Sequence, residues 1–143
     1  MLLIILGAGA SHDSVNTSQH PMDESLRPPL ANGLFDRRFD GSVRQFEQLL
    51  CVLDRLRERP NGVSLEEQLE TLQEEGVTYP KRLEQLVAIK FYLQNVLFNC
   101  GASWAHQAGQ ATNYVAMLDR IDHWRHLHDD QVAIVTFNYD LLI

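Results

Sequence analysis

The sequence predicts an α/β protein in which a parallel sheet receives a large helical insertion between its first two strands. Two observations predict the strands: an unbroken apolar run at residues 2–6, followed at once by a glycine, and a second apolar run at residues 132–135. Strands that are apolar at consecutive positions are typical of parallel sheets, in which helices cover both faces. A third observation predicts the insertion, because apolar residues recur at three- and four-residue spacing between positions 42 and 128.

Length and composition fit one globular domain that spans residues 1–143. The chain is 45% hydrophobic and 22% charged, which is enough apolar material for a core. Its formal net charge of -7 argues against a nucleic-acid partner, because an acidic chain repels phosphate. No apolar run approaches the ~20 residues of a membrane span, and the run at 2–6 lacks the basic flank of a signal peptide. We therefore expect a cytoplasmic protein without a membrane partner.

The cysteines and histidines do not form a metal-binding pattern. Cys51 and Cys100 lie far apart and form no C-x-x-C pair, which favours two small core residues in a reducing compartment, with a disulfide left open. His123, His126 and His128 cluster near a predicted helix end, but no cysteine or paired acid is spaced to complete a site with them. We expect no metal.

A long polar connection and a first helix follow the first strand. Residues 12–41 contain prolines and glycines and show no clear period, and connections of this length tend to be functional. Apolar residues at helical spacing then predict a helix over residues 43–56. Residues 60–62, Pro-Asn-Gly, end it.

Three more helices are predicted before the second strand. Residues 64–67 form a capping-box pattern that starts the first of them, and Gly76 is placed to end it. The next helix is expected over residues 80–99, with Gly101 as its terminator, and the last over residues 103–128.

The glycine turn after the first strand predicts a phosphate site. In Gly7-Ala8-Gly9-Ala10-Ser11, glycine lets a ligand approach the backbone closely, and the free N–H groups of a helix that begins there would favour phosphate. The dehydrogenase pattern fails, because position 12 is His12 instead of a third glycine and no strand ending in an acid follows about 20 residues on. A tight turn without a ligand stays open, and His12 is expected as a solvent-exposed loop residue.

A second polar motif follows the second strand, which is predicted over residues 131–137. Asn138 and Asp140 come at its carboxyl end, the edge where ligands bind in open α/β sheets. The Asn amide offers a donor and an acceptor without charge, and the Asp can accept hydrogen bonds from ribose hydroxyls. An ordinary Asx turn is the alternative.

Three segments, "IILGAGAS", "PPLANGLF" and "VAIVTFNYDLLI", occur in an order and spacing that resemble the sirtuin-like NAD-consuming domains of bacterial antiphage defence proteins. The resemblance implies a Rossmann-like, sirtuin-type sheet that binds NAD+ as substrate and cleaves its nicotinamide–ribose bond. It implies that Asn138 is the catalytic residue, which positions water or the ribose, and that Asp140 holds the nicotinamide riboside end. The phosphate turn implied by the resemblance comprises Gly7, Ala8, Gly9, Ala10 and Ser11.

Two features of this family do not appear before Ile143. The resemblance implies a histidine base after the Asn-Tyr-Asp motif, and two strands are too few for a stable sheet. We therefore expect the chain to be the N-terminal portion of a longer domain, with further C-terminal residues or a C-terminal domain. Two alternatives remain: a catalytically inactive module that binds NAD or ADP-ribose, and a fragment whose helices form a homo-oligomer. Protein deacetylation is not expected, because the four-cysteine zinc module of classical sirtuins has no counterpart.

Overall fold

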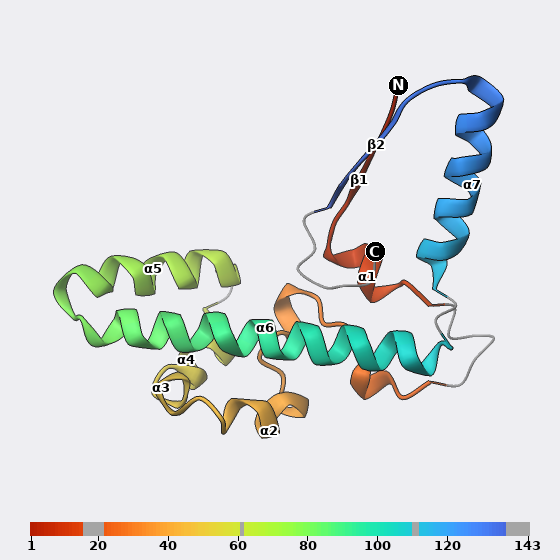
Figure 1. Ribbon diagram of the computed structural model, residues 1–143. Helices are drawn as coiled ribbons and strands as arrows, with labels where there is room; N and C mark the ends of the chain where they lie inside the picture. Colours follow the sequence, from red (N-terminus) through yellow and green to blue (C-terminus); the bar gives the residue numbers. More distant parts are fainter. Residues whose placement is uncertain (16–21, 61, 110–111, 137–143) are drawn as a thin grey trace. The chain divides into compact units, whose positions relative to one another are not determined.

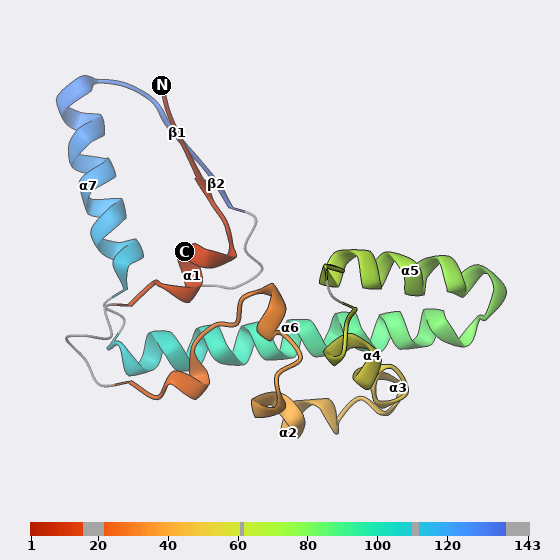
Figure 2. The ribbon, with the colours of Figure 1, turned by 180° about the vertical axis from the view of Figure 1, so that it is seen from behind.

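The computed structural model describes residues 1–15, 22–60, 62–109 and 112–136 (Figures 1 and 2). The described part is a mixed α/β structure, mostly helical, with a two-stranded parallel sheet. The chain divides into two compact units, one formed by Met1–Leu30 with Leu97–Ile143 and the other by Ala31–Val96. Each unit is described by itself below.

The sheet of the first unit consists of β1 (Leu2–Leu6) and β2 (Val132–Thr136), which confirms both predicted strands. The strands lie side by side and run parallel, in a register that pairs Leu2 with Val132 and Leu6 with Thr136 (Figure 1). The start of the pair is held by the N-terminal ammonium of Met1, which lies 2.6 Å from Oδ2 of Asp130.

The expectation that the first strand is buried on both faces is wrong for the described part of the chain. Side chains along a strand point alternately to opposite faces. Leu3 and Ile5, which share one face, are 52% and 63% exposed, and Val135 beside Ile5 is 39% exposed. An apolar face of the sheet is therefore open to solvent.

The last helices differ from the predicted ones in their bounds. Helix α6 (Lys81–Gln107) continues through Gly101, and α7 (Asn113–His128) begins ten residues later than predicted from position 103. A glycine inside a helix costs only about 1 kcal/mol relative to alanine. The buried face of α6 continues beyond Gly101 through Trp104, which is fully buried against Val15 and Ala108. The packing of this buried face therefore outweighs the low helix propensity of Gly101, and the helix continues.

The helix expected over residues 43–56 is wrong, since the second unit has three short helices there. These are α2 (Asp40–Val43), α3 (Glu47–Leu50) and α4 (Leu53–Arg57). The φ angles of Phe46 and Val52, −127° and −123°, interrupt the helical backbone between them. The short helices bury Val43, Leu49, Leu53 and Leu56, whereas Leu50, which the long helix would also have turned inward, is 48% exposed. Short 3₁₀ helices at Glu24–Leu26, Ala31–Gly33 and Arg37–Phe39 occupy part of the long polar connection.

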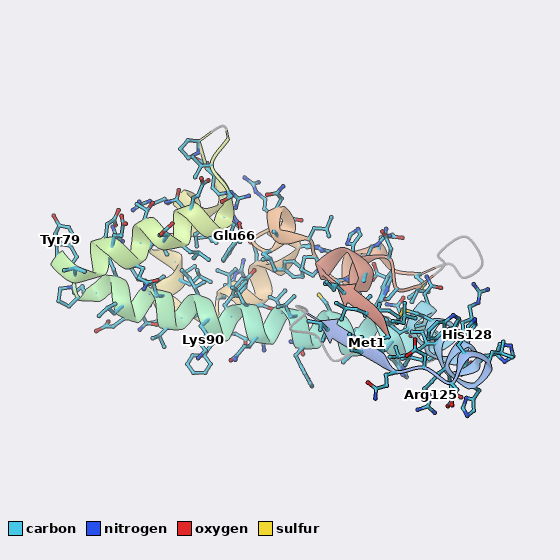
Figure 3. All side chains as sticks on the ribbon, turned by 90° about the horizontal axis from the view of Figure 1, so that it is seen from above. Met1, Glu66, Tyr79, Lys90, Arg125 and His128 are labelled. Carbon is cyan, nitrogen blue, oxygen red and sulfur yellow. The ribbon has the colours of Figure 1, made fainter. Side chains whose placement is uncertain are left out.

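Helix α5 (Leu65–Thr78) begins as predicted, and it forms a hairpin with the first part of α6 (Figures 1 and 3). The capping box is confirmed: Glu67 N–H donates to Ser64 Oγ at 3.1 Å, and Ser64 N–H donates to the Glu67 carboxylate at 2.7 Å. The prediction that Gly76 ends this helix is wrong. A Cβ at Gly76 would lie 2.9 Å from Cδ2 of Leu83, so this glycine lets α6 approach closely.

Glu75 links three helices of the second unit. Its carboxylate contacts Arg55 of α4 at 2.7 Å and Arg82 of α6 at 2.8 Å. These hydrogen bonds, of which that from Arg55 has the larger effect, lower the pKa of Glu75 below its usual 4.5.

The expectation of two buried cysteines is correct for Cys100 only, because Cys51 is exposed. Both are free thiols.

Candidate functional site at the carboxyl ends of the strands

The glycine turn follows β1 directly and starts a short helix. Gly7 is the N-cap, with extended backbone, and α1 (Ala8–His12) begins at the next residue. The first N–H groups of a helix have no acceptor within the helix. A Cβ built on Gly7 or Gly9 would meet nothing within 4 Å beyond its chain neighbours and the backbone of its own helix. Of the N–H groups in this turn, that of Ala10 already donates to the Gly7 carbonyl, at 2.9 Å.

The parallel register places the strand ends that precede the two predicted motifs at one edge of the sheet. Leu6 and Thr136 are direct partners at the carboxyl ends of β1 and β2. The glycine turn continues from Leu6, and the segment that contains Asn138 and Asp140 continues from Thr136. Asn138 and Asp140 themselves lie outside the described residues, so the structure places the strand ends that precede the two motifs.

A buried pair of hydroxyl groups anchors α1. Ser11 Oγ lies 2.8 Å from the hydroxyl of Tyr114, the second residue of α7, and the two residues are 1% and 4% exposed. The resemblance implies that Ser11 belongs to the phosphate turn. Its side chain, however, points to the protein interior. Next to this pair, Asn113 donates from its side-chain amide to the carbonyl of Asp13 at 2.9 Å, and from its backbone N–H to the carbonyl of Ser14.

A second set of contacts fixes the carboxyl end of α1. Nδ1 of His12 lies 2.7 Å from the carbonyl oxygen of Pro28, and Arg27 Nε donates to the His12 carbonyl at 2.9 Å. Arg27 also pairs with the carboxylates of Asp13, at 2.5 Å, and Glu24, at 3.1 Å. His12 is therefore a half-buried helix residue, which makes the expectation of an exposed loop histidine wrong.

Sequence reasoning missed three residues that hold the turn in place: Arg27, Asn113 and Tyr114. Arg27 lies in the long connection, which the sequence marked as functional only by its length. Tyr114 lies about one hundred residues from Ser11 along the chain. Tyr114 is the one residue of α7 with a buried side chain, a fact that only the structure shows.

An apolar groove of about 520 Å³ lies between β1 and α7. Leu2 lines it from the strand, and the other lining residues come from α7: Asn113, Ala116, Met117, Arg120, Ile121 and Trp124. Of the predicted site residues that the structure describes, 7–11, none lines this groove. The glycine turn is at the other end of β1 from Leu2.

Two absences concern only the described part of the chain. Within it, no three His, Cys, Asp or Glu side chains are grouped to hold a metal ion. Among its helices, none is long and apolar enough to cross a membrane.

Comparison of the chain with models of protein families, with curated proteins and with solved structures finds no match.

Proposed function

We propose that this chain is part of a sirtuin-like domain that hydrolyses the nicotinamide–ribose bond of NAD+ in the cytoplasm, as a component of antiviral defence. The fold proposed for the complete domain is the Rossmann-like, sirtuin-type parallel sheet, with β1 and β2 as its first two strands. One observation supports this above the others. The register pairs Leu6 with Thr136, so the strand ends that precede the glycine turn and the Asn-Tyr-Asp motif lie at the same edge of the sheet.

The proposed chemistry divides the work between the two motifs. Nicotinamide is cationic in NAD+ and a good leaving group, so the transition state resembles an oxocarbenium ion. Such a reaction depends on positioning and on polar groups around the sugar more than on a strong nucleophile. The N–H groups of Ala8 and Gly9, at the start of α1, would bind the pyrophosphate within the turn of residues 7–11. Asn138 would position water or the ribose, and Asp140 would hold the nicotinamide riboside end.

Nicotinamide release from NAD+ tests this proposal. We expect release by the full-length protein, with a loss of about a hundredfold or more in the Asn138→Ala variant, the size seen when a single polar stabilising group is removed. Asn99→Ala, which changes an exposed asparagine of α6, is the matched control and should leave the rate unchanged. Full activity in Asn138→Ala would exclude the proposed role of that residue.

Calorimetry separates the hydrolase from the inactive binding module. Heat of binding with NAD+ and ADP-ribose, together with no nicotinamide release at any protein concentration, would favour the binding module. If neither NAD+ nor ADP-ribose gives heat of binding, both the hydrolase and the binding module are excluded.

We also propose that a second copy of the chain is a partner. On α6, Leu83, Val87 and Phe91 form a stripe at four-residue spacing, and each is 52–54% exposed. A groove of about 510 Å³ beside it is lined by Phe46 and Ala88 together with the stripe. Exposed apolar surface of this kind marks interaction sites.

Light scattering tests the oligomer. Val87→Glu should lower the mass of a wild-type oligomer, while Val77→Glu, at an exposed valine of α5, should not. A wild-type chain that is monomeric at all concentrations would exclude this partner.

A further inference from the structure

An arginine surface lies in the second unit, on the short helices that cover residues 37–44. Arg37 and Arg44 stand one helical turn before and one after Asp40, a spacing that places side chains on one face. Both arginines are exposed, and Arg57 of α4 pairs with the Asp40 carboxylate. The hydrogen bond from Arg57, and then the charges of Arg37 and Arg44, lower the pKa of this carboxyl. One carboxylate thus lies among three guanidinium groups, and the arginine surface carries a net positive charge.

Helix α5 carries the opposite charge. Its charged residues are all glutamates. Two of them are engaged, one in the capping box and one in the contact with α4 and α6. The others recur every four residues and form an exposed acidic face: Glu66, Glu70 and Glu74. Among the described residues, neither these glutamates nor Arg37 and Arg44 belong to an ion pair that could neutralise them within one copy.

The two surfaces match in length and point in different directions. Seven residues of helix, as from Arg37 to Arg44, rise about 10 Å. The eight residues from Glu66 to Glu74 rise about 12 Å. Within the second unit, α5 and α2 lie on opposite sides of the first part of α6 (Figures 1 and 2). The acidic face therefore cannot reach the arginine surface of its own copy.

Resting on the proposed partnership with a second copy, we propose that the acidic face of α5 in one copy binds the arginine surface of the next. Charge complementarity favours this occupant, because one chain supplies both surfaces at a similar spacing. The arginine surface also adjoins the apolar contact proposed above, since Gln45 and Phe46, which follow Arg44, line the groove beside the stripe on α6. Because the two surfaces lie on opposite sides of α6, each copy binds one neighbour on either side. The contact is therefore head-to-tail, and it builds a ring or a filament.

Charge reversal on each surface tests this contact, with the mass measured by analytical ultracentrifugation. We expect Arg37→Glu/Arg44→Glu and Glu66→Arg/Glu70→Arg each to weaken self-association about tenfold or more, because attractive exposed pairs become repulsive. A mixture of the two variants should associate again, since each then offers the charge that the other lacks. Arg120→Glu, at an exposed arginine of α7, is the matched control and should associate like wild type.

Salt and concentration test the electrostatic and the head-to-tail character. Wild-type association should weaken when salt rises from about 0.05 M to about 0.5 M, because exposed charges are screened. The mass should rise beyond that of a dimer as the protein concentration increases. A dimer that grows no further overturns the head-to-tail contact.

The remaining outcomes separate this contact from the proposals on which it rests. An oligomer that is lost in Val87→Glu but unaffected by salt and by charge reversal overturns the contact and leaves the second copy as a partner through the stripe. Variants that stay apart when mixed and unfold at lower temperature assign these charges to folding, which also overturns it. Loss of oligonucleotide binding in Arg37→Glu/Arg44→Glu, without a change in mass, would assign the arginine surface to nucleic acid instead. A wild-type chain that is monomeric at all concentrations overturns the second copy and this contact together, while nicotinamide release still tests the hydrolase.

Discussion

The hydroxyl groups of Ser11 and Tyr114 lie 2.8 Å apart, and both residues are buried. This contact joins the glycine-turn helix to α7, two elements separated by about one hundred residues of sequence. The contact fixes the carboxyl end of α1, at Ser11. At the other end, a Cβ on Gly7 would have nothing within 4 Å beyond its chain neighbours. The carboxyl end of α1 is thus held by a buried contact with α7.

Loss of the Tyr114 hydroxyl should destabilise the protein. In Tyr114→Phe the buried hydrogen bond with Ser11 is removed while the ring remains, so we expect the free energy of unfolding to fall by about 1 kcal/mol. Urea denaturation measures this change in the free energy of unfolding. Ser11→Ala removes the same bond, and the double variant should therefore lose less than the sum of the two single losses. Strictly additive losses would show that the two hydroxyls do not interact.

Gly9→Ala should separate stability from ligand binding. The added methyl meets no atom within 4 Å and replaces a poor helix former, so stability should stay equal or rise by up to about 1 kcal/mol. The same methyl occupies the open approach to the backbone, so ADP-ribose affinity measured by calorimetry should fall. Gly41→Ala in α2, where a Cβ is equally unobstructed, is the control and should leave affinity unchanged. Unchanged affinity in Gly9→Ala would place the ligand elsewhere.

Glu75 should make stability depend on acid pH. Its hydrogen bonds with Arg55 and then Arg82 lower its pKa in the folded state below 4.5. The stabilisation is therefore complete above pH 4.5 and disappears as the pH falls through the lowered folded value. Glu75→Gln should be less stable than wild type at pH 7, and the difference should shrink below pH 4.5, as measured by urea denaturation across pH. Glu74→Gln, at an exposed neighbour, should follow the wild-type profile; a constant difference for Glu75→Gln would contradict the assignment.

The capping box of α5 should contribute measurably to stability. Ser64→Ala removes the acceptor for the Glu67 N–H, and the usual cost of losing such a cap is about 1 kcal/mol. Thr71→Ala, on the exposed face of the same helix, should instead be neutral or slightly stabilising, because alanine is the better helix former. The thermal unfolding midpoint should therefore fall in Ser64→Ala and stay equal or rise slightly in Thr71→Ala. Equal effects would mean that the cap does not limit the stability of this helix.

Sequence patterns predicted correctly those elements that are determined by residues close together in the chain. The first strand has the predicted residues and the second lies within the predicted range 131–137, because an apolar run beside a glycine or a polar motif predicts a strand without reference to the rest of the chain. The start of α5 is correct for the same reason, since a capping box is made by residues three apart. The glycine-based helix ends at Gly76 and Gly101 are wrong, because packing against Leu83 and around Trp104 decides those positions.

By itself, the sequence determined the two strands, the cap of α5 and the candidate turn at residues 7–11, all of which depend on neighbours along the chain. Only the tertiary structure decided that Leu6 and Thr136 are partners, that Tyr114 and Arg27 hold the turn, and that residues 40–57 fold as three short helices. The physical reason is that these features depend on contacts between residues far apart in the chain. Hydrophobic burial and hydrogen bonding act on whatever the fold brings together, and no local pattern encodes the partner.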